Sequence, residues 1–238
     1  GAELTGAGAF TFDNSDKTTF PGVPLPTAKM DLKLTGGNTL LDKLVAMGLS
    51  FLSASGITDV AQPLLDQLAT ATGELVRLAV VDGDTLTFVA KAQGARHGLR
   101  YDPDMGLSVQ LSCSAAGHAW LSTMSDEEAL QRVARQGFGQ PENFGPKAPT
   151  TVKSVLAFLK QARSRGFSLI VEVFAPGMSA MAAPVYNAQG QAIGVITVAG
   201  PAMRLPEPRL LALGPTLVQA ATQVGQASTG SALFKRRA

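Results

Sequence analysis

Three side chains of this sequence have the chemistry of catalytic groups: Cys113, His118 and Glu172. A cysteine at a helix start can have a lowered thiol pKa and act as a nucleophile. Cys113 and His118 are five residues apart, which in a helix places them about 140° apart around the axis, so they do not share a face. Glu172 stands in an apolar run, where a raised pKa would suit a general base or a ligand contact. The alternatives are a buried structural thiol, a structural histidine and a carboxylate that points out of a sheet.

The rest of the sequence shows no pattern of a catalytic or metal site. It has no Ser-His-Asp ordering, no Gly-rich phosphate loop and no metal-spaced His/Asp cluster, so we predict no cofactor and no metal. The single cysteine excludes an internal disulfide and a cysteine-cluster metal site. His97–Gly106 is predicted to be a polar loop with a short strand around Leu99–Tyr101, and the Tyr101 ring is a candidate to close over a ligand.

A strand meander is predicted between Gly166 and Gly200. β-branched and apolar residues, bounded by Gly, Pro and Asn, indicate strands at Phe167–Val173, Met178–Val185 and Ala192–Ala199. The last two runs are apolar on both faces, so we expect the sheet to be covered on both sides. Their many alanines leave room above the sheet for a ligand or a closely packed helix.

Local patterns elsewhere predict a hairpin and several helices. Asp82-Gly83-Asp84 joins two apolar strands, Leu75–Val81 and Leu86–Ala92. Apolar spacing of three and four, together with caps and closing glycines, predicts helices at 39–55, 58–73, 112–123, 125–137, 152–164 and after Pro208. Hairpins and a meander imply an antiparallel sheet, so the fold class is α+β, with helices packed on both faces of the sheet.

Composition indicates a globular cytoplasmic protein. The chain has 238 residues, of which 45% are hydrophobic and 16% are charged. No apolar run approaches the roughly 18 residues that a membrane helix needs. A formal net charge of +2 is too small to argue by itself for nucleic acid or an acidic membrane as a partner. Low cysteine usage fits a reducing compartment.

Three stretches, taken in order, resemble the effector-binding domain of the IclR family of bacterial transcription regulators. They are Thr72–Asp84, Leu111–Leu121 and Arg165–Pro201, with Pro176-Gly177, Ala182-Ala183-Pro184-Val185 and Val198-Ala199-Gly200-Pro201 in the third. The resemblance covers roughly residues 38–225. It implies a GAF-like fold and a small-molecule effector.

The resemblance also implies a division of the chain. Residues 38–56 match the family's linker helix and are expected to act in dimerisation, and residues 57–227 form the effector-binding domain. Residues 1–37 are too few for the winged helix-turn-helix that precedes the linker in the family. We expect them to be an extended arm with one short strand near Ala9–Phe12, or a partly disordered segment. Residues 228–238 are expected to be a flexible basic tail.

By resemblance, the effector pocket lies between the meander and the start of the Ser/Ala-rich helix. Free backbone amides at a helix start suit a carboxylate, and that role falls to Ala115 and Ala116. The sheet side carries Ile170 where small-carboxylate sensors often have an acid, and Thr197 is the only hydroxyl kept at the serine positions. An apolar pocket of this kind favours a bulky apolar or aromatic acid. The complete set of expected ligand contacts is Tyr101, Leu111, Cys113, Ala115, Ala116, Ile170, Glu172, Met178, Ala180, Thr197 and Ala199.

The sequence therefore predicts a ligand sensor that couples an organic acid to the arrangement of a homodimer or homotetramer. DNA would be bound only through a domain missing from this chain, and no membrane is expected as a partner. The alternative is an enzyme on the same scaffold that uses Cys113, His118 and Glu172 in the same pocket.

Overall fold

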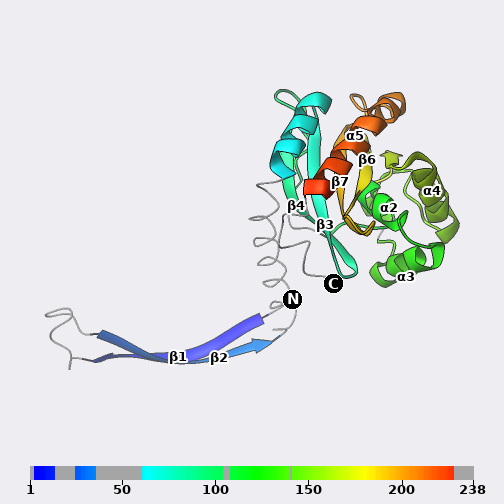
Figure 1. The fold of residues 1–238 in the computed structure, drawn as a ribbon. Helices are drawn as coiled ribbons and strands as arrows, with labels where there is room; N and C mark the ends of the chain where they lie inside the picture. The colour runs from blue at the N-terminus through cyan, green and yellow to red at the C-terminus, as the bar shows by residue number, and fades with distance from the viewer. Residues whose placement is uncertain (1–2, 14–24, 36–60, 104–107, 140, 228–238) are drawn as a thin grey trace. The chain divides into compact units, whose positions relative to one another are not determined.

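The computed structural model describes residues 3–13, 25–35, 61–103, 108–139 and 141–227. The chain divides into two compact units, Gly1–Leu49 and Ser50–Ala238 (Figure 1). In the first unit, β1 (Glu3–Asp13) pairs antiparallel with β2 (Leu25–Thr35). The expected short strand near Ala9–Phe12 falls within β1, so the arm is a paired two-stranded ribbon instead of a single strand. The predicted helix at 39–55 and the tail at 228–238 lie outside the described residues.

The second unit is built on one five-stranded antiparallel sheet of order β4-β3-β7-β6-β5. β3 (Leu75–Asp82) and β4 (Thr85–Gln93) form the predicted hairpin. β5 (Ser168–Val171), β6 (Met178–Tyr186) and β7 (Ala192–Pro201) form the predicted meander, and β7 closes the sheet by pairing with β3. β5 ends before the predicted Val173 because Glu172 has a φ of 56°, a left-handed conformation that interrupts the strand.

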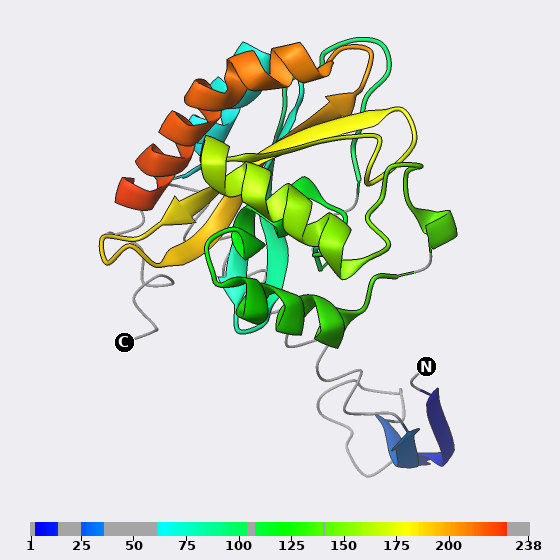
Figure 2. The same ribbon diagram turned by 90° about the vertical axis from the view of Figure 1, so that its right-hand side faces the viewer.

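Helices cover both faces of this sheet, as the sequence predicted. A helix at 61–72 and α5 (Glu207–Ala227) cover one face. The opposite side carries α2 (Ala115–Leu121), α3 (Asp126–Gln136) and α4 (Val152–Arg165) (Figures 1 and 2). Each side has its own hydrophobic core, because successive strand residues point to opposite faces. Val76, Leu78 and Val198 join the core under α5, whereas Ala79, Ala182 and Val195 join the core under α2.

The helix ends follow local capping chemistry. The Thr151 and Ser154 side chains cap each other's backbone amides at the start of α4, and Gly166, with a φ of 78°, ends that helix. Ser125 caps α3 by accepting the Glu128 amide at 3.2 Å. The sequence Ser125-Asp126-Glu127-Glu128 also predicts a capping box, in which the Glu128 carboxylate bonds back to the Ser125 amide. That bond is absent from the described contacts, and the Glu128 carboxylate pairs with Arg132 at 3.0 Å instead.

Two further predictions differ from the structure. α2 begins at Ala115 and not at Ser112, because Ser114 is in an extended conformation and caps the helix. Residues 99–101 form no strand; they belong to an irregular loop that follows β4. Among the described helices, none is long and apolar enough to cross a membrane.

Candidate functional site

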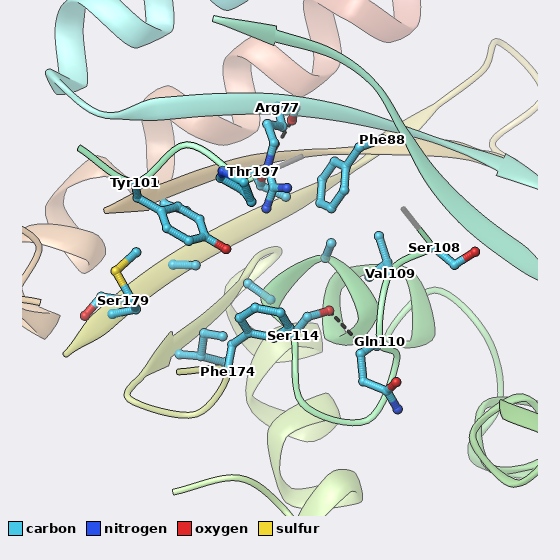
Figure 3. A pocket seen from close by; sticks show the side chains of 17 residues that line it. Arg77, Phe88, Tyr101, Ser108, Val109, Gln110, Ser114, Phe174, Ser179 and Thr197 are labelled. Carbon is cyan, nitrogen blue, oxygen red and sulfur yellow. Dashed lines mark hydrogen bonds between the residues drawn. The ribbon is translucent and has the colours of Figure 1, made fainter. Parts of the chain in front are cut away.

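A cavity of about 150 Å³ lies between the sheet and the start of α2 (Figure 3). All five strands contribute to its wall, together with the loop after β4 and the segment that leads into α2. Its lining is mostly apolar, with a few polar groups that converge on one space. The lining residues are Arg77, Phe88, Tyr101, Pro103, Ser108, Val109, Gln110, Ser114, Ala115, Ala116, Ile170, Phe174, Met178, Ser179, Ala180, Thr197 and Ala199.

The helical wall of the cavity is the first turn of α2. The Ser114 hydroxyl donates to the Gln110 carbonyl at 2.6 Å and accepts the Gly117 amide at 2.9 Å. The next helical bond goes from the His118 amide to the Ser114 carbonyl, so the amides of Ala115 and Ala116 have no acceptor among the described residues. The Ser168 hydroxyl donates to the Ala115 carbonyl at 2.6 Å and fixes this turn against β5.

The sheet wall carries one cation, Arg77 of β3. Its guanidinium carbon lies 3.6 Å from the centroid of the Phe88 ring and 5.8 Å from that of Tyr101. The Arg77 Nε is buried and has no hydrogen-bond partner in the described part of the chain. Burial lowers the pKa of Arg77, and the neighbouring Tyr101 partly opposes that shift. Figure 3 shows the guanidinium between the two rings, across the cavity from Ser114.

Hydrogen bonds fix the loop that carries Tyr101. Gln93 donates its side-chain amide to the Tyr101 carbonyl at 3.1 Å, and Arg204 donates to the Leu99 carbonyl at 2.8 Å. Arg204 is itself held by a two-point ion pair with the buried Glu74, at 2.6 and 2.8 Å. These bonds position the Tyr101 ring at the cavity wall although the loop has no regular secondary structure.

A second polar group of the wall has no partner. The Ser179 hydroxyl of β6 is buried at 1% exposure and makes no hydrogen bond to any described residue. Buried hydroxyls are normally hydrogen-bonded, since an unpaired one costs free energy. Ser179 shares its strand face with Met181, which belongs to the core under α5, so its hydroxyl is directed away from the cavity. The polar groups that the cavity offers to a ligand are therefore the Arg77 guanidinium and the two free amides.

Eight of the residues predicted as ligand contacts line this cavity: Tyr101, Ala115, Ala116, Ile170, Met178, Ala180, Thr197 and Ala199. Leu111, Cys113 and Glu172 are not among its lining residues. Leu111 is buried in the core under α2. The Glu172 carboxylate pairs with Lys147 at 3.5 Å and accepts the Gly177 amide at 3.3 Å.

None of the three candidate catalytic groups is among the residues that line the cavity. Burial raises the pKa of the Cys113 thiol to about 12, the opposite of the lowered pKa expected for a helix-start nucleophile. His118 is completely buried, bonds the Ser112 carbonyl through Nε2 at 2.7 Å and stacks on Phe158 at 4.8 Å. Its burial lowers its pKa to about 4. Within the described residues, no group of three or more His, Cys, Asp or Glu side chains is arranged to hold a metal ion.

Sequence reasoning did not find several wall residues: Arg77, Phe88, Phe174 and Ser179. Arg77 carried a usable signal, because it is a lone cation between Val76 and Leu78 in an otherwise apolar strand. The other three have the residue types of ordinary core or loop positions and carried none.

Comparison with known proteins matches residues 49–226 to the family described as bacterial transcriptional regulator IclR C-terminal. The chain is 31% identical over 177 residues to the HTH-type transcriptional regulator BhcR of Paracoccus denitrificans, covering 74% of this chain and 62% of that protein. It is 28% identical over 185 residues to the transcriptional repressor IclR of Escherichia coli, covering 77% and 66%. The chain thus spans less than two thirds of the length of both relatives.

Solved structures share the fold. Thermotoga maritima IclR aligns with a TM-score of 0.66 at 19% identity, covering 75% of this chain and 72% of that one. The inducer-binding domain of a PobR double mutant from Acinetobacter, in complex with 3-hydroxybenzoic acid, aligns with a TM-score of 0.62 at 23% identity, covering 71% and 97%.

Proposed function

The chain belongs to the IclR family of bacterial transcriptional regulators, and we propose that its cavity binds an organic acid with a bulky apolar or aromatic body. The observation that carries the proposal is the composition of the wall. Apolar side chains from five strands surround a small number of unpaired polar groups. Such a wall gains free energy by covering apolar ligand surface and uses its polar groups to orient the ligand.

Individual wall positions support a bulky ligand over a very small one. Ile170 contributes an apolar side chain to the sheet wall. Ala180 and Ala199 leave space above the sheet that larger side chains would fill. The amides of Ala115 and Ala116 are donors for an oxygen of the ligand. The PobR domain, which shares the fold, is seen with 3-hydroxybenzoic acid, an acid of the proposed class.

We further propose that the domain acts by a shift of populations. Ligand binding would favour one arrangement of subunits in a homodimer or homotetramer, with residues 38–56 as the coupling segment. DNA contacts would be made outside residues 57–227. Arm exchange between subunits through residues 1–37 is a separate possibility for assembly, and deletion of those residues tests it by oligomer size.

The direct test is a thermal-shift titration of the purified protein against three sets of acids. We expect aromatic and branched aliphatic acids to raise the melting temperature with concentration, because they bind the folded state only. Glyoxylate-sized acids should have little effect, since they leave most of the apolar wall uncovered. Stabilisation by glyoxylate-sized acids alone, or by no acid at all, would overturn the proposal.

A further inference from the structure

Arg77 is a half-buried cation in the cavity wall, and no described carboxylate forms an ion pair with it. We propose that its guanidinium binds the carboxylate of the ligand, and that Arg77 thereby selects anionic ligands with a single ring. The inference rests on the proposed function and assigns the charged contact to a residue that sequence reasoning did not single out.

In the part of the chain that the structure describes, the charge of Arg77 is not neutralised by an ion pair. Among the described residues, no carboxylate lies within ion-pair distance of Arg77, and its Nε makes no hydrogen bond. Asp102 is the acid that interacts with Arg77 electrostatically, but its oxygens already bind Lys91 at 2.7 Å and Arg100 at 3.4 Å. A charge taken out of water without a partner is costly to the folded protein. A ligand carboxylate supplies the missing partner.

Ring contacts fix the orientation of the Arg77 guanidinium before a ligand binds. Phe88 lies against it at 3.6 Å and Tyr101 flanks it at 5.8 Å, and the loop that carries Tyr101 is hydrogen-bonded in place. A planar guanidinium whose orientation is already fixed loses little rotamer freedom when it binds a carboxylate with two parallel bonds. Cation–π contact also keeps the charge in the apolar wall without neutralising it.

The volume of the cavity limits the size of the ligand. An apolar cavity of about 150 Å³ is of the size that holds one benzene ring. Phe174 lies across the cavity from Arg77 (Figure 3), and Ile170 also lines the wall; both suit a flat apolar body. A ring-sized body with a carboxylate at Arg77 fills the cavity, whereas a fused two-ring acid exceeds it.

The test compares benzoate with benzamide, which has nearly the same shape and no charge. Binding of each to the full chain is measured by isothermal titration for the wild type, Arg77→Gln and Arg77→Lys. We expect the wild type to prefer benzoate by at least tenfold. Arg77→Gln should lose that preference through weaker benzoate binding, while benzamide affinity stays within about twofold. Arg77→Lys should keep an intermediate preference, because it retains the charge without the planar fork.

Two controls separate a binding role from a structural one. Lys160→Gln removes one exposed cation from α4 and should leave the benzoate preference unchanged. The ligand-free melting temperature of Arg77→Gln should be equal to or above that of the wild type, because the substitution removes a half-buried charge that has no acidic partner among the described residues. A lower ligand-free melting temperature with equal loss of both probes would show a structural role and overturn the inference.

Other outcomes distinguish the inference from the function on which it rests. Equal wild-type affinity for benzoate and benzamide overturns the role of Arg77 but leaves an apolar ligand pocket in place. Retention of the benzoate preference in Arg77→Gln has the same meaning. Binding of neither probe overturns the inference, and the wider acid panel then decides whether the pocket binds acids at all.

Discussion

His118 makes folding stability depend on pH at the scale of a single residue. Its pKa is about 4 in the folded protein against an ordinary value of 6.5, because complete burial disfavours the charged ring. Between those values the unfolded chain binds a proton that the folded chain does not, so stability falls as the pH is lowered through this window. We expect this residue to remove about 2 kcal/mol of unfolding free energy between pH 7 and pH 5.

Denaturant titrations at both pH values test this expectation. His118→Gln should lose most of the pH-dependent difference, whatever its absolute stability. His97→Gln is the matched control, because His97 is exposed and is the only other histidine of the chain. An unchanged pH dependence in His118→Gln would contradict the assignment.

Cys113 should be chemically inert in the folded protein. The thiol is 1% exposed and burial raises its pKa to about 12, so almost no thiolate forms at neutral pH. Iodoacetamide at pH 8 should therefore leave the native protein unlabelled and label it fully in guanidinium chloride. Mass spectrometry gives a single-site readout, since the sequence has one cysteine. Rapid labelling of the native protein would reopen the enzyme hypothesis.

At the scale of elements, the ion pair between Glu74 and Arg204 joins the start of β3 to the segment that follows β7. The Glu74 side chain is 2% exposed and that of Arg204 is 31% exposed. Arg204→Leu leaves a buried carboxylate without its partner, and we expect a loss of about 2 to 3 kcal/mol of unfolding free energy, discounted for the partial exposure. Adding Glu74→Gln to Arg204→Leu should restore part of that loss.

The exposed pair of Lys91 and Asp102 is the matched control for this experiment. Its side chains are 40% and 37% exposed, so Lys91→Gln should cost less than about 1 kcal/mol. Equal costs for the buried and the exposed pair, measured by denaturant unfolding, would contradict the role given to Glu74.

Two helix glycines allow a comparison of backbone and side-chain crowding. A Cβ on Gly117 of α2 would collide with the Leu111 backbone, whereas one on Gly214 of α5 would meet the Phe167 ring. We expect Gly117→Ala to cost about 2 to 3 kcal/mol and Gly214→Ala about 1 kcal/mol, because a ring can shift more easily than a backbone. Gly117→Ala should also weaken benzoate binding, since it displaces the first turn of α2. Calorimetric unfolding of both variants tests whether Gly117→Ala loses more stability than Gly214→Ala.

The hairpin, the meander and the helix caps were predictable because local signals specify them. Asp82-Gly83-Asp84 fixes a turn, and Thr151 and Gly166 fix the ends of a helix, whatever the rest of the chain does. Seven wall residues were predictable because the family resemblance places them, and Tyr101 was predicted from its loop position. The resemblance also included Leu111, and side-chain chemistry suggested Cys113 and Glu172, but these three residues are not among the lining residues.

The wall residues that were missed depend on non-local pairing. Arg77 and Glu172 are both single charges in apolar strands, and the sequence does not say which of them points at the cavity. Pairing of β3 with β7 opposite Thr197 turns Arg77 inward, while a φ of 56° ends β5 at Glu172. The strand register and the left-handed conformation at Glu172 depend on the whole sheet. Residue type alone therefore cannot decide which way either charged side chain points.

At the scale of the whole molecule, the core residues whose burial the structure describes lie between Ala61 and Val224, and the chain divides into two compact units at Ser50. We therefore expect a chain that begins at Ser50 to keep the melting temperature and the benzoate affinity of the full chain. Size-exclusion chromatography with light scattering on the same pair of proteins measures any role of the earlier residues in assembly. A clear fall in melting temperature would show that the first unit contributes to the folding of the second.

The closure of the sheet by β3 and β7 also orders events during synthesis. The Thr197 hydroxyl of β7 donates to the Arg77 carbonyl of β3 across 120 residues of chain. These two neighbouring strands of the sheet wall therefore leave the ribosome at different times. At about 5 to 20 residues per second, the β3 hairpin waits on the order of ten seconds for its neighbour. Through that interval the edge of β3 that later pairs with β7 has no partner strand. We therefore expect the nascent β3 hairpin to be bound by a chaperone that recognises exposed strand edges. Ligand present during translation cannot hasten this step, because its binding surface does not exist until β7 has been made.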